Sequence, residues 1–142
     1  MSAGRGCHRW TVPAFVCLAL LAGGLAFFQW IRRSFTAYAV AGSSMEPAFR
    51  PGDYLLIDRR PAARRSPPDG AVVLARDPRA PDRILLKRVG WAEPDGRLWL
   101  LGDNRADSTD SRTFGPIAPT VIIGRVMFRY RRSQPAPDRD SS

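Results

Sequence analysis

The sequence contains only one histidine and two cysteines, and Lys87 is the only lysine among its 22 basic residues. Cys7 lies before a long apolar stretch and Cys17 lies inside it, so we expect no disulfide between them. With so few imidazole and thiol ligands we expect no metal site and no cofactor. The formal net charge is +9, but no helix-turn-helix, zinc-finger or RNA-binding motif accompanies it, so no nucleic-acid partner is expected. A basic surface is equally suited to an anionic membrane.

These shortages also restrict how a serine could be activated. Ser44 lies in a loop bounded by Pro47 and by the turn at Pro51–Asp53, between two strand-like stretches. A nucleophilic serine needs a base. The single histidine, His8, precedes the apolar stretch; if that stretch spans a membrane, His8 and Ser44 lie on opposite sides and a Ser-His-Asp triad is excluded. Arginine stays protonated, so Lys87 is the remaining candidate base.

Lys87 lies in a predicted strand over residues 83–91. Alternation places Leu85, Lys87 and Val89 on one face, so the lysine has apolar neighbours. Burial disfavours the ammonium ion and lowers a lysine pKa from about 10.4, as a base requires. The alternative is a solvated lysine whose aliphatic stem covers apolar surface, and this strand alone leaves both interpretations open.

A third stretch, residues 102–116, reads GDNRADSTDSRTFGP. Alone, it could be an Asx-rich turn between strands. Together with GSSMEP around Ser44 and LLKRV around Lys87, in this order, it resembles the type I signal peptidase family of membrane-bound serine-lysine endopeptidases. The resemblance covers most of residues 40–130.

The resemblance implies that Ser44 is the nucleophile, that Lys87 is the general base and that Ser108 orients the lysine amine. It also implies a supporting set and a substrate pocket. The supporting residues are Gly102, Asp103 and Asn104, which would shape the loop, and Asp110 and Arg112, which would form an ion pair. The pocket residues are Val40, Met45, Phe49 and Leu86.

Two positions depart from the most frequent pattern of the family. Some members carry a serine two residues before the nucleophile, where its hydroxyl helps to form the oxyanion hole, but this chain has Gly42. Backbone N–H groups, that of Ser44 first, would then hold the oxyanion. Phe49 stands where a leucine often faces the substrate, so we expect a narrowed or reshaped pocket.

The apolar stretch comprises residues 12–31 and carries no charge. As a helix it would cross about 30 Å of hydrocarbon, with residues 1–11 as a short flank and Arg32 and Arg33 at the interface. The alternative is a cleaved signal peptide, whose apolar core is usually only about 7–15 residues long. Residues 37–39 look like a cleavage site but lie beyond both arginines, so we expect a permanent single-pass anchor.

Short apolar runs separated by proline and glycine predict a mainly β catalytic domain over residues 34–132, with a disordered tail at 133–142. The expected strands are 36–41, 55–57, 71–74, 83–91, 98–100 and 121–130, with loops at 59–70 and 77–82 and a bulge at Gly124. A hairpin turning at Pro94–Gly96 would return residues 102–112 towards Lys87.

The expected function is removal of signal peptides from exported proteins by a membrane-anchored endopeptidase. A second interpretation is a specialised maturation protease that removes a leader peptide, as in nickel superoxide dismutase maturation. A third, from another class, is a non-catalytic basic module tethered to the membrane. Flanking arginines do not decide the topology; the resemblance places the catalytic domain on the extracytoplasmic side of the cell membrane. The precursor and the oligomeric state stay open.

Overall fold

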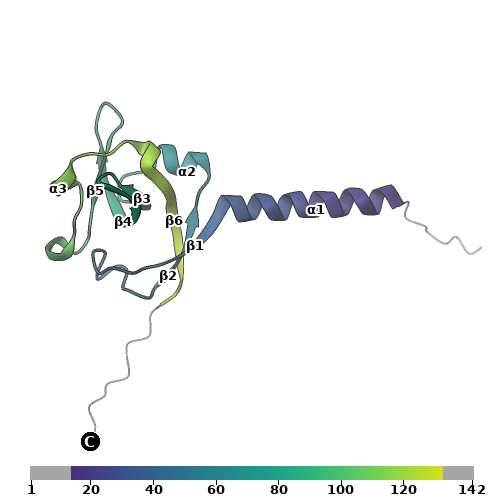
Figure 1. The fold of residues 1–142 in the computed structure, drawn as a ribbon, viewed down its shortest axis with the longest axis horizontal. Helices are drawn as coiled ribbons and strands as arrows, with labels where there is room; N and C mark the ends of the chain where they lie inside the picture. The colour runs from purple at the N-terminus through teal and green to yellow at the C-terminus, as the bar shows by residue number, and fades with distance from the viewer. Residues whose placement is uncertain (1–13, 133–142) are drawn as a thin grey trace, which may run out of the picture. The chain divides into compact units, whose positions relative to one another are not determined.

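The computed structural model describes residues 14–132 (Figure 1). The chain divides into two units, one ending at Arg32 and the other beginning at Arg33. The first contains the helix α1 and the second contains the sheet. The predicted flank at 1–11 and tail at 133–142, together with His8, lie outside the described residues.

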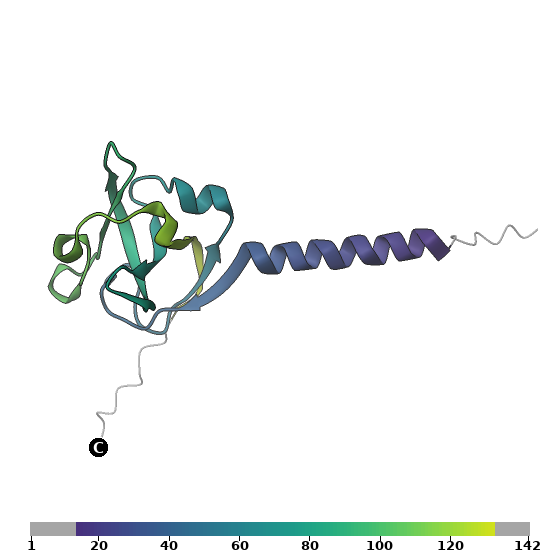
Figure 2. The same ribbon diagram turned by 45° about the horizontal axis from the view of Figure 1, so that its top comes forward.

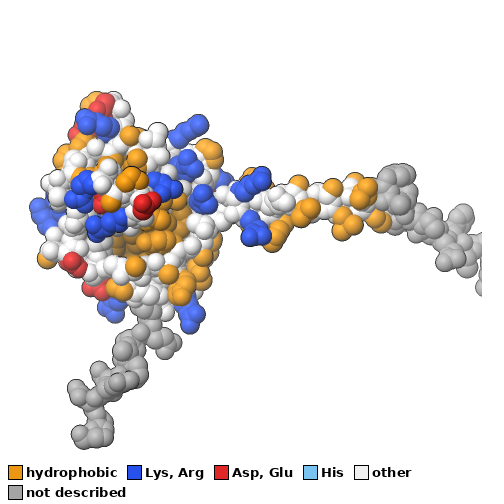
Figure 3. All heavy atoms as spheres, in the orientation of Figure 1, with side chains coloured by type: hydrophobic (Ala, Val, Ile, Leu, Met, Phe, Trp, Pro, Cys, Tyr) orange, Lys and Arg blue, Asp and Glu red, His pale blue; other side chains and the backbone are white. Residues whose placement is uncertain are grey.

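Helix α1 runs from Ala14 to Ser34. Its segment from Val16 to Ser34 is long and apolar enough to cross a membrane, and no residue of its most apolar 18-residue window is buried. Apolar side chains such as Leu21 (72% exposed) and Phe27 (61%) cover the helix surface, and arginines follow at its end (Figure 3). A long helix with so much exposed apolar surface favours a lipid environment. The helix extends beyond the predicted run, through Arg32 and Arg33.

The second unit is built on one antiparallel sheet with the strand order β1-β2-β6-β3-β4-β5 (Figure 2). This architecture confirms the predicted mainly β fold. Each of the six predicted strands is present within the described residues. Their bounds are β1 Phe35–Ala39, β2 Tyr54–Asp58, β3 Val72–Asp77, β4 Ala80–Ala92, β5 Leu98–Leu101 and β6 Ile122–Arg131.

Two of the predicted loops differ from the structure. Residues 59–70 were expected to be irregular but include the short helix α2, Pro61–Arg65, whose first turn suits the fixed backbone of proline. The predicted turn at 77–82 is shorter, because β4 already begins at Ala80. The Asp77 carboxylate accepts hydrogen bonds from the backbone N–H and the guanidinium of Arg79, which closes a tight turn.

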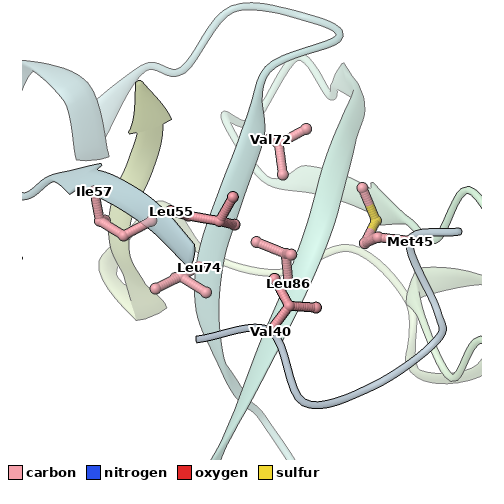
Figure 4. Packing of buried hydrophobic residues seen from close by; sticks show 7 residues of the cluster. All are labelled: Val40, Met45, Leu55, Ile57, Val72, Leu74 and Leu86. Atoms are coloured by element: carbon pink, nitrogen blue, oxygen red, sulfur yellow. The ribbon is translucent and has the colours of Figure 1, made fainter. Parts of the chain in front are cut away.

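The strand β3 is buried on both faces, and a separate apolar cluster covers each one. Alternating residues of β3 enter different clusters, as the two-residue period of a strand requires. The first cluster comprises Val40, Met45, Leu55, Ile57, Val72, Leu74 and Leu86 (Figure 4). The second comprises Val73, Ala75, Val89, Leu98, Leu100, Ile117 and Ile122. In β4, Leu86 and Val89 pack in different clusters, which agrees with the predicted alternation.

The predicted bulge near Gly124 is present one residue away. Leu74 pairs with Gly124 and Ala75 pairs with Ile122, which leaves Ile123 as the extra residue. A Cβ at position 124 would lie 2.5 Å from the backbone oxygen of Asp58, so the close approach of β2 to β6 requires glycine there.

Candidate active site

Ser44 lies in a loop, residues 40–53, that is closed at its base. The N–H of Val40 donates to the carbonyl of Asp53 (2.9 Å), and the N–H of Gly52 donates to the carbonyl of Val40 (2.7 Å). The next residue after Ser44, Met45, is fully buried in the first apolar cluster. This anchor fixes the backbone beside Ser44, so the position of its hydroxyl does not depend on a free loop.

Lys87 lies in the middle of β4, opposite Val73 of β3, and its residue surface is only 2% exposed. Its Nζ donates a hydrogen bond of 2.6 Å to Ser44 Oγ. The structure therefore joins two sequence positions 43 residues apart that the shortage of bases had paired.

The pKa of Lys87 lies below its ordinary value, chiefly because burial disfavours the ammonium ion. Two carboxylates, Asp110 and Asp107, oppose the shift by favouring the charged form, and the guanidinium groups of Arg83 and Arg112 reinforce it. The effect of burial is larger than the opposing effects of the charges, so the pKa of Lys87 is lowered, as a base requires.

The Gly-Asp-Asn sequence attaches the second loop, residues 102–112, to both sides of this pair. Asp103 accepts two hydrogen bonds from Arg88 (2.8 and 2.6 Å), the residue after Lys87 on β4. The backbone N–H of Asn104 donates to the carbonyl of Ser44 (3.0 Å). These three hydrogen bonds tie the loop to the strand that bears the lysine and to the turn that bears the serine.

Gly102 permits a close approach between the loops. A Cβ at this position would overlap the hydroxyl of Ser108 and would lie 2.8 Å from the carbonyl oxygen of Ser44. The side chain of any other residue would push the two loops apart.

Asp110 is fully buried and connects the second loop internally. Its carboxylate accepts hydrogen bonds from the N–H of Gly102 (2.8 Å), the hydroxyl of Ser108 (2.8 Å) and the guanidinium of Arg112 (3.0 and 2.5 Å). Burial alone would raise the pKa of Asp110, but these hydrogen bonds together hold it well below the ordinary value. The expected ion pair between Asp110 and Arg112 is present in the structure.

Ser108 and Lys87 line the same cavity. The Ser108 hydroxyl donates to Asp110 Oδ2 (2.8 Å). Because a hydroxyl has one proton and two lone pairs, this bond orients the proton towards Asp110 and leaves the oxygen able to accept.

A cavity of about 500 Å³ opens beside the pair. Of the four expected pocket residues, Val40, Met45 and Leu86 line it, but Phe49 does not. Phe49 packs against the first apolar cluster, with the guanidinium of Arg129 5.6 Å from its ring centre. The expectation that Phe49 would narrow the pocket therefore differs from the structure, because the turn after Met45 directs this ring towards β6. The cavity is lined by Tyr38, Val40, Ala41, Gly42, Ser43, Ser44, Met45, Arg83, Ile84, Leu85, Leu86, Lys87, Ala106, Asp107, Ser108 and Thr109.

Sequence reasoning missed a second hydroxyl in the cavity. Ser43 Oγ donates to Asp107 Oδ2, and the carbonyl of Ser43 accepts from the side chain of Asn104 (3.3 Å). The sequence also did not predict the role of Ser111, whose buried hydroxyl accepts a hydrogen bond from the N–H of Leu100 on β5 (2.9 Å). The paired serines at 43–44 were the only local signal for the first contact, and they do not identify its partner.

Within residues 14–132, no cluster of three histidine, cysteine, aspartate or glutamate side chains is arranged to hold a metal ion.

Comparison with known proteins identifies the family of this chain. The family model described as signal peptidase, peptidase S26, matches residues 9–92 and 90–131. The mitochondrial inner membrane protease subunit 1 of Xenopus tropicalis is 34% identical over 108 residues, with 63% of this chain and 65% of the relative covered. Subunit 1b of the mitochondrial ATP-independent inner membrane protease of Arabidopsis thaliana is 33% identical over 117 residues, with 67% and 69% covered.

Mitochondrial inner membrane protease subunit 2 of Danio rerio is 30% identical over 129 residues, with 70% of each chain covered. The chain thus spans slightly less than two thirds of the Xenopus relative and slightly more of the other two. The family match extends from the apolar helix to the end of β6 and includes Ser44, Lys87 and the 102–112 loop. The chain therefore belongs to the signal peptidase family, peptidase S26.

Proposed function

We propose that this chain is a membrane-anchored serine endopeptidase that removes signal peptides from exported proteins, with Ser44 as nucleophile and Lys87 as general base. The observation that carries the proposal is the 2.6 Å contact between Ser44 Oγ and the amine of a lysine that is 2% exposed. A solvated lysine covering apolar surface, the alternative interpretation of Lys87, would not be buried in this way.

The reaction proceeds through an acyl-enzyme. Neutral Lys87 takes the proton of the Ser44 hydroxyl while Ser44 Oγ attacks the carbonyl carbon of the peptide bond. The resulting ammonium then gives its proton to the leaving amine, so Lys87 is neutral again. In the second half, Lys87 takes a proton from water, whose oxygen attacks the ester carbonyl carbon. The ammonium then gives this proton to Ser44 Oγ as the ester bond breaks, which frees the acid product and restores neutral Lys87.

Backbone groups stabilise the developing oxyanion. Within the described residues, the N–H of Ser44 donates no hydrogen bond, so it is available to a tetrahedral oxygen. Gly42 also lines the cavity but contributes no side-chain donor. The supporting role of Ser108 is to accept a hydrogen bond from the Lys87 amine while its hydroxyl donates to Asp110. This hydrogen bond would direct the amine towards Ser44.

The catalytic domain comprises residues 34–132 and α1 is its anchor. The relatives are named as inner membrane proteases, and the apolar surface of α1 supports a membrane location for this chain. We place the domain on the extracytoplasmic side of the cell membrane, where signal peptides emerge. Substrates of this site are precursor polypeptides.

The first experiment replaces the chromosomal gene with one encoding Ser44→Ala. Precursors of exported proteins should accumulate with their signal peptides intact and should be identifiable by mass spectrometry of the membrane fraction. Ser43→Ala is the matched control, because it removes a neighbouring hydroxyl and should leave processing in place. Normal processing in the Ser44→Ala strain would refute the proposal.

A second experiment tests the topology with reporters fused after Arg132, beyond β6. A reporter that works only after export should be active, and one that works only in the cytoplasm should be inactive. The reverse pattern would exclude general signal-peptide removal. It would favour the specialised maturation protease, which acts on a leader peptide in the cytoplasm.

A further inference from the structure

Arg83 is the one arginine that lines the catalytic cavity within the described residues. It precedes Lys87 by four residues on β4, which corresponds to about 13 Å along an extended strand. The register of β4 is irregular at this point: Arg76 pairs with Ile84, whereas the next residue, Asp77, pairs with Ala80. Residues 81–83 of β4 therefore have no paired residue in β3. Irregularities of this kind beside active sites redirect side chains.

The guanidinium of Arg83 has little to bind within the protein. Its side chain is 59% exposed, and its ion pair with Asp77 is long, at 3.9 Å. Asp77 already accepts shorter hydrogen bonds from Arg79, at 2.9 Å from the backbone and at 3.2 and 3.0 Å from the side chain. Within residues 14–132, the guanidinium of Arg83 donates no hydrogen bond. Its planar set of donors is thus available to a ligand.

The other arginines near the site already form ion pairs within the protein. Arg88 donates to both oxygens of Asp103, and Arg112 donates to both oxygens of Asp110. Among the described residues, the one acidic side chain in the cavity wall is Asp107, which accepts a hydrogen bond from the hydroxyl of Ser43, next to Ser44. The cavity wall therefore contains a guanidinium without a close partner, that of Arg83, towards the start of β4, and a carboxylate, that of Asp107, beside Ser43.

We propose that Arg83 is a specificity determinant that binds an aspartate or glutamate of the precursor, three to five residues from the cleaved bond. This inference rests on the proposed function. An extended substrate rises by about the same 3.3 Å per residue as β4, so a side chain that meets Arg83 lies about four residues from the bond at Ser44. A guanidinium binds a carboxylate through two parallel hydrogen bonds, which selects aspartate over asparagine.

The test uses the full-length chain in detergent micelles and a fluorogenic peptide that it cleaves. Asparagine and aspartate are exchanged at each position from the fifth before to the fifth after the cleaved bond, and kcat/KM is measured for each pair. The ratio of the two rates should reach on the order of 10-fold at one position, three to five residues from the bond. Ratios within one enzyme cancel any effect of Arg83 on the pKa of Lys87.

Three variants then assign the preference. Arg83→Gln should reduce the ratio at that position to about 1, Arg83→Lys should retain part of it, and Arg83→Glu should favour lysine over aspartate there. Arg97→Gln is the control, because Arg97 pairs with Asp95 outside the cavity and its variant should retain the wild-type ratio.

The outcomes separate the two proposals. Ser44-dependent cleavage with no preference for aspartate at any position, or with the same preference in Arg83→Gln, overturns the role of Arg83 and leaves the proposed function standing. Failure of the wild-type chain to cleave any peptide or native precursor in a Ser44-dependent way overturns the proposed function, and the role of Arg83 with it.

Discussion

The two sides of the 42–46 turn present adjacent serines to opposite surroundings. Ser44 faces β4, where its hydroxyl bonds the buried amine of Lys87. Ser43 faces the 102–112 loop, where its hydroxyl bonds the exposed carboxylate of Asp107. Both serines have an ionisable partner, so a hydrogen bond alone does not distinguish the proposed nucleophile from its neighbour. The difference is that burial lowers the pKa of the amine, whereas water solvates the carboxylate.

The largest expected effect separates the two serines directly. Ser44→Ala should lower kcat/KM for a peptide substrate by at least about 10⁴-fold, because no other group forms the acyl-enzyme. Ser43→Ala should lower it by less than about 10-fold. Burst kinetics with an ester substrate would show the acyl-enzyme in Ser43→Ala and not in Ser44→Ala. Equal losses in the two variants would contradict the assignment of Ser44 as the nucleophile.

Lys87→Arg should reduce kcat/KM nearly as far, by about 10³-fold or more, because a guanidinium keeps its proton. In the wild type, the neutral fraction of Lys87 rises with pH through its lowered pKa. The rate should therefore increase towards alkaline pH, with a midpoint below the pKa of about 10.4 for a free lysine. A profile of kcat/KM that is flat from mild acid to pH 9 would contradict a lysine base.

Ser108→Ala should have an intermediate effect. The loss of one positioning hydroxyl should lower kcat by about 10- to 1,000-fold, while KM and the thermal unfolding midpoint change little. The pH midpoint of kcat/KM should shift as well if the hydroxyl contacts the amine. A variant with wild-type kcat and an unchanged pH profile would assign Ser108 to the Asp110 hydrogen-bond network alone.

The smallest effect is expected at Gly42. A Cβ at this position meets no atom within 4 Å, so a serine fits without displacement. Gly42→Ser would add a hydroxyl to the cavity wall and should raise kcat a few-fold if it reaches the oxyanion. Gly42→Ala is the matched control, because it adds the Cβ without the donor. Equal rates in the two variants would leave stabilisation of the oxyanion to the backbone.

The sequence predicted the strands well because each has a local signal. The shortage of bases led to the pairing of Lys87 with Ser44, and the two side chains are in contact in the structure. The contacts of the loops were harder to predict from the sequence. The contact between Ser43 and Asp107 depends on how two loops 64 residues apart are folded against each other, and neither has a periodic pattern. Phe49 shows the same limit, since its direction follows from the turn after Met45 and from Arg129 on a distant strand. Helix α2 was missed because five residues carry too little pattern.

Because Lys87 is the only lysine and is buried, NMR spectroscopy could observe its amine without interference from other lysines. Cells grown on lysine carrying ¹³C at its ε carbon would yield a protein with one labelled side chain, since every other basic side chain except His8 is an arginine. One NMR resonance would then follow the protonation of the Lys87 amine across a titration, with no assignment step and no mutation. A labelled chain with an acyl group on Ser44 would show how the same amine responds once its hydroxyl partner is lost.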